Sequence, residues 1–196
     1  LPLGHEYPGA PPQISCERAL ALLKPWLESD ARRKVGQNLK FDSHVLLNHG
    51  MQLAGIAHDT LLQSYVLEVH ERHDLDSLAL RHLGWETITY DEVTGKGAAR
   101  IPFSAGEIGR ATEYAAEDAD CALALHEALY PRIAAEEKLR YVYAQIELPV
   151  LPVLLGMERN GVLLDAERLE RQSRELGREM LEIEQQAYQA AGQPFN

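Results

Sequence analysis

A long helical pattern at residues 105–130 constrains this chain more than any other stretch. Tyr114 and Asp118 are four positions apart in it, so they lie one above the other on one helix face. Small alanines beside them would let a neighbouring element approach the backbone closely: Ala115, Ala116 and Ala119. A stacked acid and phenol suit a site where the carboxylate holds a metal ion and the hydroxyl orients a water. The stretch also fits an exposed acidic turn, because Glu117 and Asp120 cluster with Asp118 and charge runs are usually solvated.

The rest of the chain predicts short strands that alternate with helices. Short strand-like stretches are 34–38, which leads into a turn, 55–58, 162–164 and the β-branched 87–90. A first helical pattern follows Ser15 and ends at about residue 27. Further helical patterns cover 40–49, 61–67, 75–83 and 165–191. Polar N-caps support four helix starts: Ser15, Asp59, Asp74 and Asp165. For Asp59 the capping role is favoured over a catalytic one.

Glycine and proline mark where helices should stop. Gly50 is expected to end the helix 40–49 as its C′ residue. An apolar segment at 139–157 contains Pro149 and Pro152, and Pro149 should end or kink the helix near Leu148.

Composition limits the class of protein. The chain has 196 residues, 45% hydrophobic and 25% charged, which is ordinary for a globular domain with a sizeable core. A net charge of −11 argues against a simple basic-patch nucleic-acid binder, but it is silent about local patches such as 32–40 and 72–82. No apolar run approaches the length of a membrane span. Cys16 and Cys121 form no CxxC pair and are expected to be small buried residues in a reducing compartment.

Asp42 falls at an unusual place in the predicted helix 40–49. Phe41, Val45 and Leu46 form the expected apolar stripe of that helix, and Asp42 borders it. A charge at such a border must be paired, bound to a metal or held at the edge of the stripe. All three readings stay open from spacing alone.

Six stretches occur in an order that points to one family: KVGQNLKFD, GIAHDT, HDLDSLA, TITYDE, YAAEDAD and ERNGVLLD. From about residue 14 to 196 the series closely resembles the bacterial DNA polymerase I family, family A of the DNA polymerases. The resemblance implies an α/β, ribonuclease H-like 3′→5′ proofreading exonuclease domain at 1–136. It further implies the start of the polymerase domain, with the base of its thumb, at 137–196. We expect a helix-rich fragment of a longer polypeptide that lacks the first strands of the exonuclease fold.

The exonuclease of this family uses four metal-binding acids and a tyrosine. The resemblance implies Asp42 as the acid of the second motif, Asp118 as the acid of the third motif and Tyr114 as the tyrosine. Two divalent ions, Mg²⁺ or Mn²⁺, suit such oxygen ligands. Asp118 would hold the ion that activates water, Tyr114 would orient that water, and Asp42 would serve the second ion. We therefore expect the carboxylates of Asp42 and Asp118 to lie within about 4–8 Å of each other.

Four further positions match nucleic-acid contacts in this family. Gln37 and Asn38 would hydrogen-bond near the terminal nucleotide. Tyr90 would pack against a frayed 3′ end, and Arg72 would contact a phosphate. Each also has an ordinary reading in a turn, in strand packing or as an exposed charge. The implied partner is DNA, as a single-stranded 3′ end or a primer-template, and the implied parent is a monomeric, cytoplasmic bacterial protein of DNA replication and repair.

The other two acids of the family's site come from an Asp-x-Glu motif upstream of this sequence. Asp165 and Glu167 imitate that motif after an apolar stretch, but their place in the chain is wrong and Asp165 suits a helix cap. With only two acids, we expect the 196 residues alone to be a poor exonuclease even in millimolar metal. The catalytic acids of polymerisation lie further downstream in the family.

Two alternatives remain. A standalone exonuclease that resembles ribonuclease D shares the Tyr-x-x-x-Asp pattern, but it does not explain the thumb-like sequence after Asn160. A non-catalytic DNA-holding domain is the second alternative, and the retained Asp42, Tyr114 and Asp118 speak against it.

Overall fold

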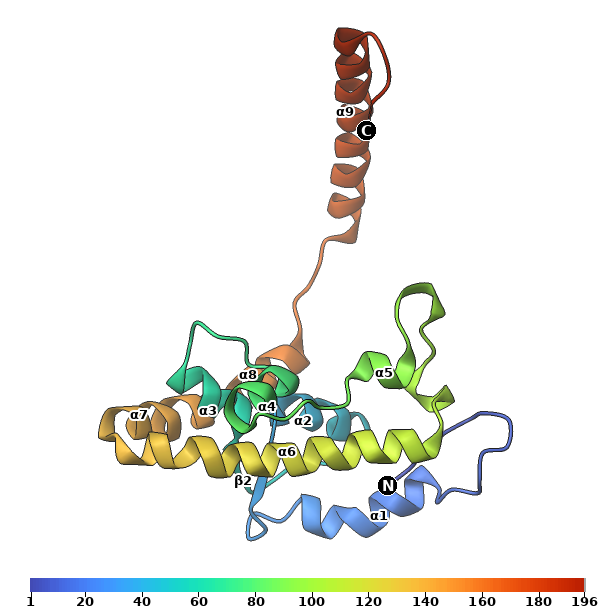
Figure 1. The fold of residues 1–196 in the computed structure, drawn as a ribbon. Coiled ribbons are helices and arrows are strands. Elements are labelled where there is room, and N and C mark those ends of the chain that lie inside the picture. The colour runs from blue at the N-terminus through green and yellow to red at the C-terminus, as the bar shows by residue number, and fades with distance from the viewer. Residues whose placement is uncertain (196) are drawn as a thin grey trace. The chain divides into compact units, whose positions relative to one another are not determined.

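The computed structural model describes residues 1–195 and divides into two compact units, Leu1–Arg159 and Asn160–Asn196 (Figure 1). The first unit is rich in helix and contains one small sheet. Its elements are α1 (Cys16–Leu27), β1 (Lys34–Gly36), α2 (Leu39–Asn48), β2 (Ile56–Asp59), α3 (Thr60–Leu67), α4 (Leu75–Leu83), α5 (Tyr90–Thr94), 3₁₀ turns at Gly97–Ala99 and Phe103–Ala105, α6 (Ile108–Ala135), α7 (Glu137–Val142), a π-helical turn (Tyr143–Glu147) and α8 (Leu148–Asn160). No helix of residues 1–195 is both long and apolar enough to cross a membrane.

The sheet contains two parallel strands, β1 and β2. Val35 pairs with His58 and Gly36 with Asp59, so both strands end at the same edge. The chain turns from that edge into α2 and α3. The start of each of these helices is therefore fixed by the sheet, which matters for the site below.

The hydrophobic core lies where α4 packs against α6. Its fully buried members are Leu78, Ala79, Cys121, Leu125 and Leu129. Three leucines pack against it: Leu67, Leu75 and Leu83. Figure 1 shows α6 running the length of the first unit, so this one helix carries both the core residues and the upstream turn with Tyr114 and Asp118. Truncating a core leucine to alanine would cost about 2–5 kcal/mol.

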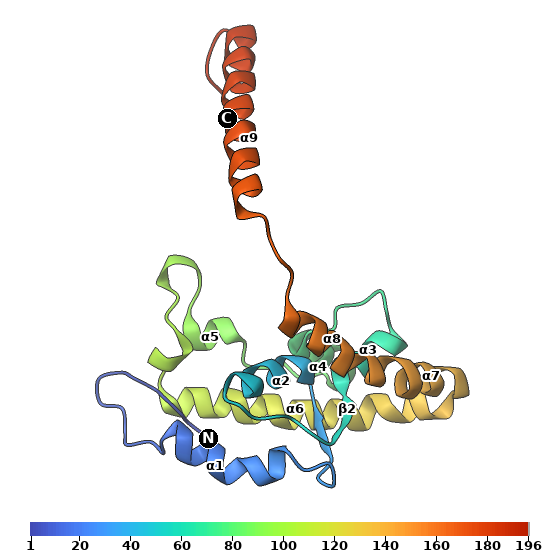
Figure 2. The ribbon, with the colours of Figure 1, turned by 180° about the vertical axis from the view of Figure 1, so that it is seen from behind.

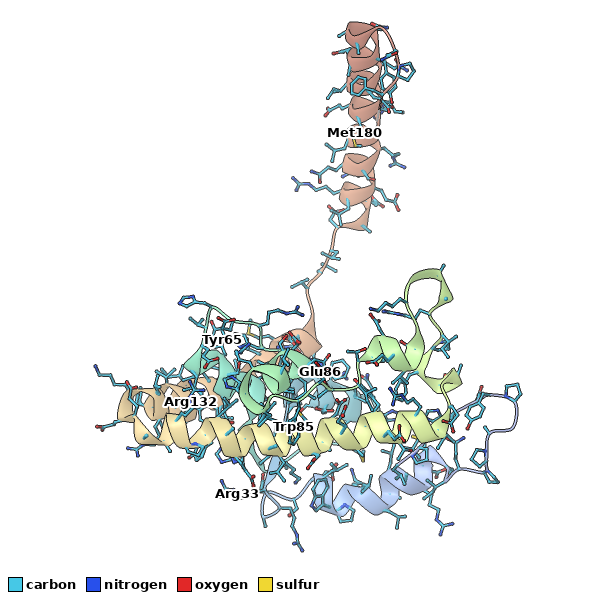
Figure 3. All side chains as sticks on the ribbon, viewed as in Figure 1. Arg33, Tyr65, Trp85, Glu86, Arg132 and Met180 are labelled. Carbon is cyan, nitrogen blue, oxygen red and sulfur yellow. The ribbon has the colours of Figure 1, made fainter. Side chains whose placement is uncertain are left out.

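A charged cluster closes one end of this core. Glu68, which follows α3, accepts from Arg81 at 3.0 Å and from Arg132 at 2.9 Å. Arg132 comes from the last part of α6 and is labelled in Figure 3. His82 approaches the same carboxylate at 3.3 Å. Burial alone would raise the pKa of Glu68, but the hydrogen bonds and charges of these basic partners lower it below its usual value. The cluster ties the ends of α3 and α4 to α6.

The second unit, as far as residue 195, contains α9 (Ala166–Ala191) after a stretch of coil. Asp165 caps α9 by accepting the Arg168 N–H at 2.9 Å, which confirms both the helix and its predicted cap. The strand predicted at 162–164 is wrong, because this stretch pairs with no strand among the described residues and is highly exposed. Apolar side chains are exposed along α9: Leu169, Leu176, Met180 and Ile183.

The other predicted caps are confirmed. Ser15 accepts the Arg18 N–H at 3.3 Å, and Asp74 accepts the Ser77 N–H at 3.0 Å. Asp59 caps α3 through the Leu61 N–H at 2.9 Å. Gly50 follows α2 with φ of 68°, the left-handed conformation that a C′ glycine supplies.

Several predicted element boundaries need correction. Residues 87–90 form no strand, because Thr89 is used as the N-cap of α5 in a capping box with Glu92. The helix predicted at 105–130 begins later, at Ile108, where Glu107 caps it, and it runs through Pro131 to Ala135. Pro149 does not end the helical path, because α8 continues from Leu148 to Asn160, but a π-helical turn at Tyr143–Glu147 interrupts the α-helical pattern just before Leu148.

The predicted apolar face of α2 is wrong. Phe41 is 63% exposed and Val45 is 43% exposed, whereas Leu39 and Ser43 are the buried residues. The cause is a tertiary contact. The Leu39 N–H at the start of α2 donates to the carboxylate of Asp59 at the end of β2, and this contact decides which face of α2 is buried. Cys16 is likewise exposed, and only Cys121 is buried as expected.

Candidate active site

One cleft of about 860 Å³ brings together residues that are far apart in sequence. Its walls come from the end of β1 and the start of α2, from the loop and first turn of α4, and from the first half of α6. Five residues singled out from the sequence line it: Gln37, Asn38, Asp42, Tyr114 and Asp118. Asp42 and Asp118 therefore face the same cavity from different helices.

Asp42 lies in the first turn of α2, and within residues 1–195 its carboxylate forms no ion pair. Its basic neighbours Lys40 and His44 both pair with Glu158 instead. The side chain is open to solvent, yet nearby protein atoms remove enough water to raise its pKa. The negative charge of Asp59 adds to this effect, and a backbone N–H opposes it. An acid with a raised pKa and no bound cation is suited to receive one.

Tyr114 and Asp118 are half-buried on α6. Burial raises the pKa of Asp118, and the charges of Asp76 and Glu117 raise it further, while the Tyr114 hydroxyl acts in the opposite direction. Burial, followed by the charge of Asp118, raises the pKa of Tyr114 to about 12. Tyr114 therefore keeps its proton at neutral pH and remains a hydrogen-bond donor at the cleft.

Two more aspartates line the cleft, but both are engaged. Asp74 caps α4 and accepts from Arg72 at 2.9 Å. Asp76 accepts the Thr87 hydroxyl at 2.9 Å. Among residues 1–195, no group of three or more acids, histidines or cysteines is placed to hold one ion. The two remaining carboxylates fit Mg²⁺ or Mn²⁺ in kind but fall short of a full ligand set in number.

Gln37 and Asn38 occupy the turn from β1 into α2. The Gln37 amide donates to the His73 carbonyl at 2.7 Å and its oxygen accepts the Thr60 hydroxyl, so this side chain braces the cleft wall. Asn38 has a φ of 57°, which a non-glycine residue rarely adopts and asparagine tolerates best. Its side chain makes no capping bond to α2 and is exposed at the cleft.

Asp59 has a second role that spacing did not reveal. Asp59 is 1% exposed, and its carboxylate accepts the N–H groups of Asn38 at 3.0 Å and Leu39 at 2.8 Å, besides capping α3. Asp59 therefore supplies hydrogen-bond acceptors for the N–H groups at the start of α2, where the Asn38 side chain makes no capping bond. One buried carboxylate thus fixes the origin of two helices, including the one that carries Asp42.

Arg72 and Tyr90 lie outside the residues that line the cleft. Arg72 is 81% exposed at its side chain and is paired with Asp74. Tyr90, at the start of α5, stacks on Phe103 with ring centroids 6.0 Å apart and meets Tyr114 edge-on at 6.5 Å. Phe103 also contacts Tyr114 at 6.1 Å. The three rings form an aromatic rim next to the cleft, and Phe103 is the member that sequence reasoning missed.

Comparison with known proteins decides the family. A family profile described as 3′-5′ exonuclease matches residues 5–134. The chain belongs to this 3′-5′ exonuclease family. DNA polymerase I of Pseudomonas aeruginosa is 48% identical over 100% of the chain and 22% of its own length. DNA polymerase I of Rhizobium leguminosarum is 42% identical over 94% of the chain and 18% of its own length. The chain thus spans about a fifth of the length of these curated relatives.

A solved structure has a similar fold. It is the POL domain of Pol1 from M. smegmatis in complex with DNA primer-template and dNTP, with a TM-score of 0.66 and 25% identity over 93% of this chain and 29% of that chain. The match to the exonuclease family ends at residue 134, and the compact units divide at Asn160. The domain boundary predicted after residue 136 stays a prediction, as do the roles of the individual site residues.

Proposed function

We propose that this chain is part of a DNA polymerase I and contributes to its metal-dependent 3′→5′ proofreading exonuclease, with a ribonuclease H-like fold. The observation that carries the proposal is the meeting of Asp42, Tyr114 and Asp118 in one cleft. Membership of the exonuclease family and the DNA polymerase I relatives support it. DNA is the proposed partner, in keeping with the primer-template held by the solved relative.

The proposed reaction is hydrolysis of the last phosphodiester bond at a 3′ end. When bound, two divalent ions supply a nucleophilic hydroxide and relief of charge on the leaving oxygen. Asp118 and Asp42 are the residues of this chain that would hold them, because both carboxylates face the cleft without an ion-pair partner among the described residues. Tyr114 would orient the attacking water by hydrogen bonding from its protonated hydroxyl.

Two acids do not complete such a site. In the family resemblance, the other two come from an Asp-x-Glu strand outside these 196 residues. We propose that this strand completes the ligand set and that the 196 residues alone hydrolyse DNA poorly. The aromatic rim and Asn38 would hold the terminal nucleotide by stacking and hydrogen bonding. Gln37 acts mainly as a brace, and Arg72 would have to leave Asp74 to reach a phosphate.

The test uses the longest natural protein that carries this segment. Asp118→Ala is expected to reduce release of mononucleotides from a labelled single strand to background, while template-directed DNA synthesis stays near the wild-type rate. Asp120→Ala is the matched control, because Asp120 is an exposed acid on the same helix. A loss of synthesis in step with hydrolysis would contradict separate active sites, and full hydrolysis by Asp118→Ala would contradict the assignment of the cleft.

A further inference from the structure

Two side chains that follow the family match reach back to the elements that build the cleft. The match ends at residue 134, whereas Tyr143 lies in the π-helical turn and Glu158 near the end of α8. Both belong to the first compact unit. Neither lines the cleft itself, so any effect they have on it must pass through other residues.

Tyr143 acts on Asp59. Tyr143 is 1% exposed, and its hydroxyl accepts hydrogen bonds from the Asp59 backbone N–H at 3.1 Å and from the Gln63 side-chain amide at 3.2 Å. The Asp59 carboxylate in turn accepts the N–H groups at the start of α2. The path from the π-helical turn to the first residue of α2 therefore consists of two consecutive sets of buried hydrogen bonds.

Glu158 acts on the next turn of α2. It binds Lys40 with one carboxylate oxygen and His44 with the other, at 2.8 Å for His44. Lys40 and His44 stand two positions before and after Asp42 on the helix. Arg159 then donates to Asn48, the last residue of α2, at 2.6 Å. Figure 2 shows α8 beside α2, as these contacts require.

The two sets of contacts hold α2 from both sides of Asp42. Tyr143, through Asp59, fixes where the helix begins, and Glu158 holds the turn of α2 around Asp42 by binding Lys40 and His44. A carboxylate needs a fixed position to ligate Mg²⁺, because this ion demands near-ideal geometry. Residues that orient a ligand without touching the ion commonly alter metal affinity or activity by about 10–100-fold when changed.

We propose that Tyr143 and Glu158 are positioning residues of the exonuclease cleft, acting on Asp42 through α2. This inference rests on the proposed exonuclease function. The segment from residue 137 to 159 is then not only a connection toward the following unit but a working part of the exonuclease. A shift at the end of α8 would reach Asp42 through Lys40 and His44.

The experiment compares Glu158→Gln and Tyr143→Phe with matched controls in the longest natural protein that carries this segment. Glu137→Gln changes an exposed glutamate on α7, and Tyr141→Phe removes the hydroxyl of an exposed tyrosine two residues before Tyr143. Exonuclease activity on a labelled single strand is measured over a Mg²⁺ titration and over a DNA titration. DNA synthesis by the same preparations reports whether the separate polymerase site is intact, and urea titration followed by circular dichroism reports whether each variant is folded.

We expect each positioning variant to raise the Mg²⁺ concentration for half-maximal hydrolysis about 10-fold or more, with little change in KM for DNA. Synthesis and both control variants should stay at the wild-type level. A purely structural role would not produce this selective change in metal dependence. If Tyr143→Phe does not fold, Glu158→Gln decides, because Glu158 lies at the surface.

The outcomes separate the two proposals. Wild-type hydrolysis combined with unchanged Mg²⁺ dependence in Glu158→Gln would overturn the positioning role and leave the exonuclease assignment standing. Absence of metal-dependent hydrolysis in the wild-type protein would overturn the exonuclease assignment, and the positioning role would fall with it.

Discussion

The buried face of α3 and the cleft beside it both contain polar side chains, but they use them in opposite ways. On α3 the fully buried residues are Thr60, Gln63 and Ser64. Thr60 bonds to Gln37, Gln63 to His126 and Tyr143, and Ser64 to His73. Within the described chain, the Gln63 carbonyl oxygen is the atom of this face left without a partner. In the cleft, by contrast, Asp42 and Asp118 point at open space.

Asp59 and Asp42 make the contrast sharpest. Burial raises the pKa of Asp59 as desolvation raises that of Asp42, so a shifted pKa does not distinguish them. Their partners do, because Asp59 accepts three backbone N–H groups and Asp42 has no cation paired with it among residues 1–195. A buried acid whose lone pairs are filled from within builds the fold, and an acid left unfilled is available to a ligand.

The largest expected effect tests the ligand-facing side of this comparison. In the longer protein, Tyr114→Phe should slow hydrolysis about 10²–10⁴-fold, because it removes only the hydroxyl proposed to orient water. Metal binding should persist, since both aspartates remain. Single-turnover hydrolysis at saturating Mg²⁺ measures the effect. Hydrolysis at the wild-type rate would show that the hydroxyl plays no part in the reaction.

A second prediction compares the loss of stability when Asp59 or Asp42 is replaced by alanine. Asp59→Ala should lower the free energy of unfolding by about 2–4 kcal/mol, because it removes two helix caps and leaves buried N–H groups unsatisfied. Asp42→Ala should change it by less than about 0.5 kcal/mol, as a surface substitution does. Urea titration followed by circular dichroism compares them. Equal losses of unfolding free energy in both variants would contradict the distinction between Asp59 as a structural acid and Asp42 as a ligand-facing acid.

A third prediction concerns the histidines next to the polar face of α3. Burial, then the nearby His126 and Arg33, lowers the pKa of His58 to about 4, and burial also lowers the pKa of His126. The rings of these histidines stack at 4.3 Å, and His58 lies against Tyr130 and Tyr143. The fold therefore favours the neutral form of both rings.

The sign follows from proton binding. Above pH 6.5 His58 is unprotonated in both the folded and the unfolded chain. Between pH 6.5 and 4 the unfolded chain binds a proton at His58 and the folded chain does not. As the pH is lowered from 6.5 to 4, the free energy of unfolding should therefore fall by about 1–2 kcal/mol, after allowance for the partial exposure of the His58 ring. His58→Gln should flatten the dependence, and His70→Gln, at an exposed position, should not. Urea midpoints at pH 4.5 and 7 give the answer.

The smallest expected effect calibrates the value of an exposed cap. Ser15→Ala removes one cap bond at the surface and should cost about 1 kcal/mol, against the larger loss predicted for Asp59→Ala. The same urea titration measures both. A Ser15 effect as large as that of Asp59 would mean that the second helix start held by Asp59 contributes nothing.

Local signals were the predictable part of this fold. Ser15, Asp74 and Asp165 cap helices that follow them directly, so the pattern within a few residues was sufficient. The second role of Asp59 depends on the parallel pairing of β1 with β2, which brings residues 38 and 59 together. No local pattern contains that pairing.

The site divides in the same way. Helical spacing alone placed Tyr114 and Asp118 on one face. For Asp42 spacing left three readings open, and only the family resemblance assigned it to a metal ion. The shared cleft appeared only in three dimensions. The stripe predicted on α2 failed because exposure of Phe41 is decided by what α2 packs against. Tyr143 and Glu158 had no sequence signal of function at all, since their importance arises from contacts more than 80 and 110 positions away.

The coil between the two units has a practical consequence for handling the protein. Val162, Leu163 and Leu164 are 85%, 102% and 68% exposed, and Arg159 stands just before them. Extended, uncovered chain of this kind is what proteases bind, and chymotrypsin would be directed to the two leucines. Preparations should therefore be cleaved first by chymotrypsin after Leu163 or Leu164, and a gel of such a digest would yield the exonuclease unit with Glu158 still attached.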